Sequence, residues 1–358
     1  MSPAQKTINF SMILCFLLSA CRSAPYPDGI YAELETNRGT IVLELDLERT
    51  PMTTANFIGL AEGTITNQAF PAGHPFFDGT VFHRVVPGHV IQAGIPIGGE
   101  TDSPGYTIPN EISSDLSHDR TGILGMANAG PHTNSSQFYI TLGDRSYLDG
   151  NFTIFGRVIE GLPVVQSIQQ GDTAQRIKIL RIGKKARRFR VDNDSFNRHK
   201  IEVEQNVGRM EEENKKKEAE WIRTNWPDAI QSPQGSLFQI TQTGTGAMPE
   251  TGRRLLVRYS GLFPDGTSFC STGEAGRPFR GEEGEPFLFV VGTTSITAGL
   301  DAALTDMRRG EHRTIICPPE LGYGIQGFYA RPREGERRFV ISPNTTLVYF
   351  VELLDIRN

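Results

Sequence analysis

Apolar and polar residues alternate over two long stretches of the chain, the first at 30–183. Around the turn-forming residues Asn37 and Gly39, every second residue is apolar. This pattern predicts a β-hairpin, because successive side chains of a strand point to opposite faces of the sheet. Thr50 is the predicted N-cap of a helix that ends at Gly63. We expect a mainly β domain with little helix.

The second stretch covers about 236–357. Residues 255–259 again alternate, and the continuous apolar run 347–351 is typical of a buried strand. The single helix-like segment is 298–307. A second β-rich domain around one short helix is therefore expected.

The segment 184–230, between the two stretches, is highly charged. Glutamates 211–213 precede lysines 215–217, so opposite charges lie three and four residues apart, which stabilises a solvated helix. We expect a helical linker; the basic residues at its start leave attachment to an anionic surface as the alternative. Trp221 and Trp226, the only 2 tryptophans, are expected to dock it on the second domain.

Length and composition agree with two domains. The chain has 358 residues, and a prior of roughly 150 residues per domain predicts about two. A formal net charge of -5 gives no reason to expect binding to nucleic acid, so proteins or peptides are the expected partners. Beyond the leader, Cys270 and Cys317 are too few for a disulfide framework, and their spacing does not tell whether they pair.

The N-terminal residues predict the compartment. The apolar stretch 8–18 after Lys6 has signal-peptide length and is too short to span a bilayer. Leu18-Ser19-Ala20-Cys21 resembles the bacterial lipobox, whose cysteine is diacylated and becomes the first residue of the mature protein. We expect 1–21 to be a lipoprotein signal peptide and Cys21 to anchor the protein in the bacterial cell envelope, on the periplasmic side of a membrane or on the outer surface. A buried N-terminal helix is the alternative, which the prolines that follow disfavour.

An arginine and a glutamine stand among apolar residues of the first domain, in Phe82-His83-Arg84-Val85-Val86-Pro87-Gly88 and Ile91-Gln92-Ala93-Gly94. We expect the guanidinium of Arg84 to be buried on one strand with Gln92. A buried charge needs a partner or a task. Arg84 therefore either pairs with a carboxylate of the core or acts on a substrate.

Longer motifs follow these residues in order. They are Gly-Ile-Leu-Gly-Met-Ala-Asn-Ala-Gly-Pro at 122–131, Thr-Asn-Ser-Ser-Gln-Phe-Tyr-Ile at 133–140, Leu148-Asp149-Gly150 and Phe155-Gly156. Together they resemble the signature of the cyclophilin family over 30–183. The resemblance implies an eight-stranded antiparallel barrel capped by two helices. It also implies cis-trans isomerisation of X-Pro bonds, with no cofactor and no metal.

The resemblance assigns roles to individual residues. Arg84 matches the arginine that donates a hydrogen bond to the prolyl nitrogen of the twisted amide. Gln92 and the backbone of Asn128 match groups that hold the carbonyl side. The matching wall of the proline pocket is Val90, Tyr139 and Leu148.

Four positions depart from the family. His89 and Tyr139 stand where phenylalanine is common, Tyr147 replaces the tryptophan of cyclosporin-sensitive members, and Phe152 replaces a histidine. Because all four keep rings in the pocket, we expect activity to survive and cyclosporin binding to be weak. A rim histidine that is only packed and solvated is the alternative for His89.

Aromatic residues recur in successive strands of the second domain. The motifs Val-Arg-Tyr-Ser-Gly at 257–261, Pro-Phe-Leu-Phe at 286–289, Pro-Pro-Glu-Leu-Gly-Tyr-Gly at 318–324 and Ile-Ser-Pro-Asn-Thr-Thr-Leu at 341–347 come in an order that resembles the FKBP family over about 236–357. The resemblance implies an α+β fold, a curled antiparallel sheet around one short helix, and prolyl isomerase activity. Ordinary core packing of the aromatics is the alternative. The positions that match the family pocket or its rim are Tyr259, Phe269, Cys270, Phe287, Ile296, Leu300, Tyr323, Ile341 and Tyr349.

Two of these positions depart from the family. Leu300 replaces a frequent tryptophan at the pocket floor, and Cys270 stands where the family has aspartate, so macrolide binding is expected to be weak. Long loops at 271–285 and 325–338 flank the pocket.

The sequence therefore predicts a membrane-anchored peptidyl-prolyl isomerase with two catalytic domain types. Its partners would be proline-containing peptides and unfolded or exported client proteins, whose X-Pro bonds limit folding. In the alternative, the FKBP-like domain is a non-catalytic peptide-binding or chaperone module, which Cys270 favours. Arg84, Gln92 and Asn128 favour catalysis by the first domain.

Overall fold

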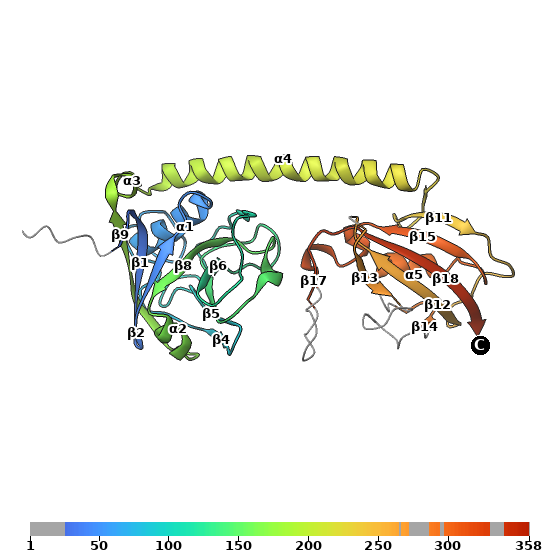
Figure 1. The fold of residues 1–358 in the computed structure, drawn as a ribbon, viewed down its shortest axis with the longest axis horizontal. Coiled ribbons are helices and arrows are strands. Elements are labelled where there is room, and N and C mark those ends of the chain that lie inside the picture. Colours follow the sequence, from blue (N-terminus) through green and yellow to red (C-terminus); the bar gives the residue numbers. More distant parts are fainter. Residues whose placement is uncertain (1–25, 265, 272–285, 294–296, 330–339, 358) are drawn as a thin grey trace, which may run out of the picture.

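The structure is a computed structural model that describes residues 26–357, apart from 265, 272–285, 294–296 and 330–339 (Figure 1). Cys21 and Ile296, which the sequence singled out, lie outside the described residues. Within those described, no helix is long and apolar enough to cross a membrane.

The first domain is built on one antiparallel sheet in the order β3-β9-β1-β2-β8-β6-β7-β5-β4. The hairpin that the sequence predicted is present, with Thr36 paired to Gly39. The sheet has nine strands in this part of the chain, one more than the resemblance implied, because the two-residue β3 pairs with β9. The strands are β1 (Gly29–Thr36), β2 (Gly39–Leu45), β3 (Thr80–Val81), β4 (Arg84–Val86), β5 (Val90–Ala93), β6 (Ile123–Met126), β7 (Phe138–Thr141), β8 (Ile154–Glu160) and β9 (Thr173–Ile182).

Helix α1 (Pro51–Glu62) packs its apolar residues into the core of this sheet and ends at Gly63 as predicted, in a left-handed conformation with φ 69°. Thr50 occupies the N-cap position, but its hydroxyl donates to the carbonyl of Asp46 and caps nothing. The carboxylate of Glu111 accepts from the first backbone N–H groups of the helix instead. The short helices of this domain are η1 (Ser146–Leu148) and α2 (Leu162–Ser167).

The charged segment forms α3 (Gly183–Arg188) and the 33-residue helix α4 (Asn193–Asn225), which runs along both domains in Figure 1. Asp192 and Ser195 form a reciprocal capping box at the start of α4. Phe196 of its first turn is buried in the core of the first domain. Trp226, at its end, packs against Phe350 of the second domain, as the sequence predicted.

The second domain is a curled antiparallel sheet around α5 (Ala298–Leu304). Its central strand β12 (Arg254–Leu262) pairs with β13 (Ser268–Ser271), β14 (Phe287–Val290) and β18 (Leu347–Arg357). The prediction of a mainly β protein with this architecture is confirmed. The other elements are β10 (Ile230–Gln231), β11 (Leu237–Gln242), β15 (His312–Cys317), η2 (Pro319–Leu321), η3 (Gly324–Gln326), β16 (Phe328–Tyr329) and β17 (Val340–Ile341).

Candidate active sites

A chain of polar side chains runs from β4 across β5 to the residue that precedes β7 in the first domain. Arg84 on β4 lies opposite Gln92 on β5, and its guanidinium donates to Oε1 of Gln92 at 3.2 Å. The amide of Gln92 donates in turn to Oε1 of Gln137 at 2.9 Å. The chain holds the guanidinium in one orientation, with most of its donors unused by these contacts.

Two expectations about Arg84 are wrong. The residue is exposed and not buried, and it shares a pair of strands with Gln92, not one strand. The physical reason is that β4 is the last strand of the sheet order, so its free edge faces solvent. Within the described residues, Arg84 forms no ion pair with a carboxylate, which argues against a purely structural pairing.

A small apolar cluster lies on the strands next to Arg84, where Gln92 of β5 is paired with Tyr139 of β7. Val90, Tyr139 and Leu148 form a small buried cluster that is separate from the main core of the domain. Three residues pack against this cluster while remaining partly exposed: Ala127, Tyr147 and Phe152. The structure thus brings the predicted wall residues together, on strands β5 and β7 and the segment around η1.

The Tyr139 hydroxyl of this cluster is held by a histidine that the sequence did not reveal, His118. The hydroxyl of Tyr139 lies 2.7 Å from Nε2 of His118, and Nδ1 of His118 lies 2.6 Å from Oδ1 of Asp149. Burial lowers the pKa of His118, although the Asp149 carboxylate opposes this shift. A neutral imidazole that donates to Asp149 and accepts from Tyr139 satisfies both contacts.

Asn128 lies at the rim with its side chain turned into the protein. Its Nδ2 donates to the carbonyl of Asn151 at 3.0 Å, and its Oδ1 accepts from the N–H of Gly130 at 3.3 Å. These contacts fix the loop and engage the side chain of Asn128 within the protein.

His89 and Tyr147 meet at another part of the rim. The Tyr147 hydroxyl lies 3.3 Å from Nδ1 of His89, and the two ring centroids are 6.2 Å apart. Both residues are partly exposed. This pair places two rings beside the apolar cluster, against which Tyr147 packs.

Aromatic residues also converge inside the second domain. Tyr259 lies against Phe287 and Tyr349 with centroids 6.1 and 6.3 Å away, and Phe269 contacts Tyr349 at 5.6 Å. Leu300 and Ile341 are fully buried in the same cluster, and Tyr323 is partly buried against it. Cys270 contributes its backbone to β13, where it pairs with Gly261. Cys317 is a free, buried thiol, and burial raises its pKa to about 11.

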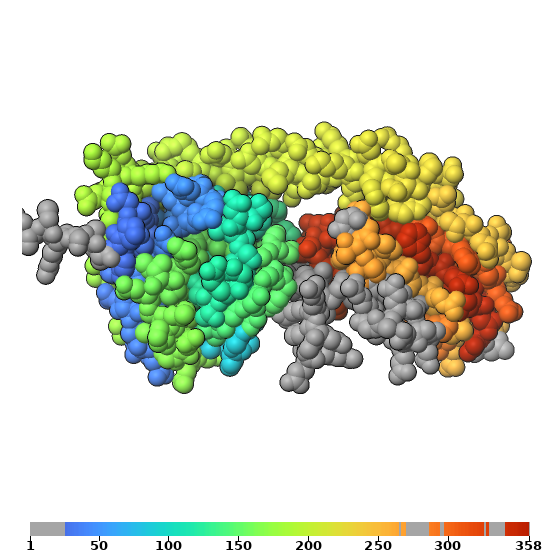
Figure 2. All heavy atoms as spheres, in the orientation of Figure 1, coloured from blue at the N-terminus to red at the C-terminus, as the bar shows by residue number. Residues whose placement is uncertain are grey.

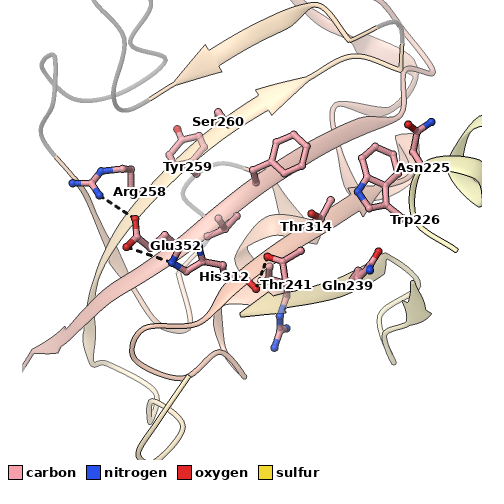
Figure 3. A pocket seen from close by; sticks show the side chains of 13 residues that line it. Asn225, Trp226, Gln239, Thr241, Arg258, Tyr259, Ser260, His312, Thr314 and Glu352 are labelled. Carbon is pink, nitrogen blue, oxygen red and sulfur yellow. Dashed lines mark hydrogen bonds and ion pairs between the residues drawn. The ribbon is translucent and has the colours of Figure 1, made fainter. Parts of the chain in front are cut away.

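A separate cavity of about 520 Å³ lies on the outer face of this sheet, where α4 ends (Figure 3). Trp226 and Phe350 form an apolar part of its wall. Glu352, also in the lining, lies 3.0 Å from Arg258 and 3.6 Å from His312. The cavity is therefore part of the joint between helix and sheet.

The first domain thus combines an antiparallel sheet with an apolar cluster and, on the adjoining strands, a guanidinium held by an amide. Residues 31–184 match the family described as cyclophilin type peptidyl-prolyl cis-trans isomerase, and residues 246–354 match FKBP-type peptidyl-prolyl cis-trans isomerase. The chain belongs to the cyclophilin family and carries an FKBP-type domain as well. Both families that the sequence indicated are confirmed, and the protein is a peptidyl-prolyl cis-trans isomerase.

Two relatives from Mycobacterium bovis and Schizosaccharomyces pombe agree with this assignment. A probable peptidyl-prolyl cis-trans isomerase A of Mycobacterium bovis is 45% identical over 148 residues, 40% of this chain and 81% of the relative. Peptidyl-prolyl cis-trans isomerase ppi1 of Schizosaccharomyces pombe is 49% identical over 135 residues, 37% of this chain and 80% of the relative. A solved cyclophilin-type isomerase of Cryptosporidium parvum covers 43% of this chain and 98% of its own, at 28% identity and a TM-score of 0.37.

Proposed function

We propose that the first domain isomerises X-Pro bonds through Arg84, Gln92 and the backbone of Asn128. The observation that carries this proposal is the guanidinium held by Gln92, whose strand neighbour Tyr139 belongs to the apolar cluster with Val90 and Leu148. The pocket takes the proline ring, and the guanidinium reaches the amide beside it.

The physical task is to favour the twisted amide over both planar forms. Rotation about the X-Pro bond has a barrier of about 18–20 kcal/mol, because the amide has partial double-bond character. Twisting removes the resonance and leaves the prolyl nitrogen able to accept a hydrogen bond. A donor that Gln92 already orients is therefore used most strongly in the transition state.

The test is Arg84→Ala in the full chain. The proline-limited isomerisation rate of a model peptide is measured while the second domain is blocked, so that the rate reports the first domain alone. First-domain turnover should fall by about 10²- to 10³-fold, the cost of removing one transition-state donor. Arg120→Ala is the matched control, because Arg120 is exposed and paired with the neighbouring Asp119. Near-normal turnover in a folded Arg84→Ala protein would remove Arg84 from the mechanism.

We propose that the second domain is also catalytic. Its closed aromatic cluster around Tyr259, Phe269 and Tyr349 supports a pocket that desolvates the amide. Residual turnover of the Arg84→Ala protein that rapamycin suppresses would support catalysis by this domain. Binding of a proline peptide without such turnover would favour the non-catalytic peptide-binding alternative.

We further propose that the protein is lipid-anchored at Cys21 in the bacterial cell envelope and assists folding of exported proteins. The support is the signal-like stretch and the lipobox-like Leu18-Ser19-Ala20-Cys21. Two acyl chains give stable anchoring where one is marginal. Cys21→Ser should abolish metabolic palmitate labelling and detergent partitioning. A wild-type protein that is unlabelled and freely soluble would contradict the proposal.

A further inference from the structure

The two domains touch each other directly, in addition to their shared helix. Nδ2 of Asn151 in the first domain lies 3.4 Å from Oγ of Ser342 in the second. A Cβ atom at Gly130 would lie 3.2 Å from the carbonyl oxygen of Ile325. The Asn151–Ser342 contact and this close approach place residues near Gly130 and Asn151 of the first domain against η3 and the residue after β17 of the second.

On the first domain, both contact points lie at the rim of the isomerase pocket. Asn151 directly precedes Phe152, whose ring packs on Tyr139 with centroids 6.1 Å apart. The carbonyl of Asn151 and the N–H of Gly130 both bond to the side chain of Asn128. A peptide that leaves this pocket along the Asn128 loop therefore meets the second domain.

On the second domain, the contact points also adjoin candidate pocket residues. Ser342 directly follows Ile341, which is fully buried in the aromatic cluster, and Ile325 comes two residues after Tyr323, which packs against it. The side chain of Ile325 is 62% exposed. An exposed apolar residue thus stands at the point where the second domain approaches the Asn128 loop.

Helix α4 fixes this arrangement at several points along its length. Near its start, Asn193 donates to the hydroxyl of Thr66 at 3.0 Å. Further along, Glu211 lies 3.4 Å from Nε2 of His132, and Glu218 accepts from Thr346 at 2.5 Å. A helix of 33 residues is about 50 Å long and resists bending. Figure 2 shows its atoms continuous over both domains.

We propose that the two pockets form one bivalent surface for a single extended polypeptide with two prolines, one for each pocket, at a spacing that α4 sets. The proposal rests on the proposed function only in requiring that each pocket binds an X-Pro segment. Proline-containing segments suit such a surface because they are already extended and lose little conformational entropy on binding. The second proline then binds at a high effective concentration.

The first experiment uses the wild-type chain and peptides with two X-Pro sites separated by about 2 to 20 residues, each of which spans roughly 3.3 Å when extended. Affinity is measured by calorimetry against the same peptides with one proline replaced by alanine. We expect one spacer length to bind about 10- to 100-fold more tightly than its single-proline control, in a 1:1 complex. An absence of any such gain across the series would overturn the proposal.

The second experiment changes α4 between Lys215 and Lys216, where both side chains are exposed. Inserting two alanines turns the second domain by about 200°, whereas inserting seven turns it by only about 20° and lengthens the helix by roughly 10 Å. The two-residue insertion should abolish the gain. The seven-residue insertion should preserve it and move the optimum to a spacer about three residues longer.

Turnover of single-proline peptides and thermal melting of each variant complete the design. Both insertions should leave single-proline turnover unchanged and lower melting only slightly, since Phe196 and Trp226 keep their contacts and the Asn151–Ser342 contact is the one lost. An unchanged gain at the original spacer in the two-residue variant would contradict a rigid α4. Absence of turnover of single-proline peptides by the wild type would instead refute the proposed catalysis. The affinity gain with two-proline peptides would still test the bivalent surface, because it is measured as binding.

Discussion

Replacing Tyr139 by phenylalanine would remove one oxygen atom from the floor of the first pocket and leave its ring in place. The hydroxyl is 2.7 Å from Nε2 of His118, and His118 is fully buried. Nδ1 of the same ring is already engaged by Asp149 at 2.6 Å. The substitution therefore leaves a buried acceptor nitrogen without this donor.

The cost follows from that loss. A buried polar atom that loses its partner destabilises the folded state by about 1–3 kcal/mol. For a domain of roughly 150 residues, each 1 kcal/mol lowers Tm by about 2–4 °C. The melting transition of the first domain should fall by about 2–12 °C. Turnover should change by less than about 10-fold, because the apolar ring that contacts proline remains.

Tyr147→Phe is the matched control. It also removes a phenolic hydroxyl from the same pocket, but from a partly exposed residue whose hydroxyl is 3.3 Å from His89. Its effect on stability should be within about 0.5 kcal/mol. Both variants are melted by calorimetry in the full chain at neutral pH. Equal melting temperatures for the two variants would refute the view that His118 depends on the Tyr139 hydroxyl.

Three further predictions concern pH, a buried ion pair and a drug. Burial lowers the pKa of His118 below its ordinary 6.5, so the unfolded state takes up a proton first as the pH falls. The free energy of unfolding should therefore decrease below pH 6.5, by up to about 1.4 kcal/mol per pH unit. His118→Gln, melted at several pH values, should lose stability less steeply with falling pH than the wild type. Equal slopes of stability against pH would show that His118 is not the group responsible. Arg313→Ala should destabilise the second domain by about 3–5 kcal/mol, because it strands the buried Glu311 carboxylate 2.6 Å away; a melting shift equivalent to less than about 1 kcal/mol would contradict this. Cys270→Asp should tighten rapamycin binding by about 10- to 100-fold in calorimetry under reducing conditions, because a carboxylate accepts charge-assisted hydrogen bonds that a thiol makes poorly. Unchanged affinity in a folded variant would assign the drug preference to the neighbouring loops.

The sequence singled out Val90, Tyr139 and Leu148 through their match to the family's motifs, and the structure brings these three residues into one cluster. Arg84 and Gln92 are joined by a tight turn, so strand pairing sets them opposite each other once the hairpin forms. The burial of Arg84 was mispredicted because its apolar neighbours indicated an interior strand. Only the order of strands, which depends on contacts far apart in the chain, reveals that β4 lies at the edge.

His118 could not be identified by the same reasoning. Its partners Tyr139 and Asp149 are 21 and 31 residues away, and no spacing rule links three such positions. In the sequence it stands beside Asp119 and Arg120, which suggests a solvated turn. A buried histidine in a polar segment is recognised only when the fold brings a phenol and a carboxylate to its two nitrogens.

The relative position of the two pockets could not be predicted from the charge pattern of the linker either. The alternating charges of α4 predict a solvated helix, and a helix that is polar all round commonly bridges domains through solvent. The anchors are local exceptions to that pattern: Phe196 in the first turn and Trp226 just past the last. Since each anchor is held by a different domain, any residue added between them must move one pocket relative to the other. The length of α4 is therefore constrained by function if a single polypeptide bridges the pockets, and free to vary if it does not.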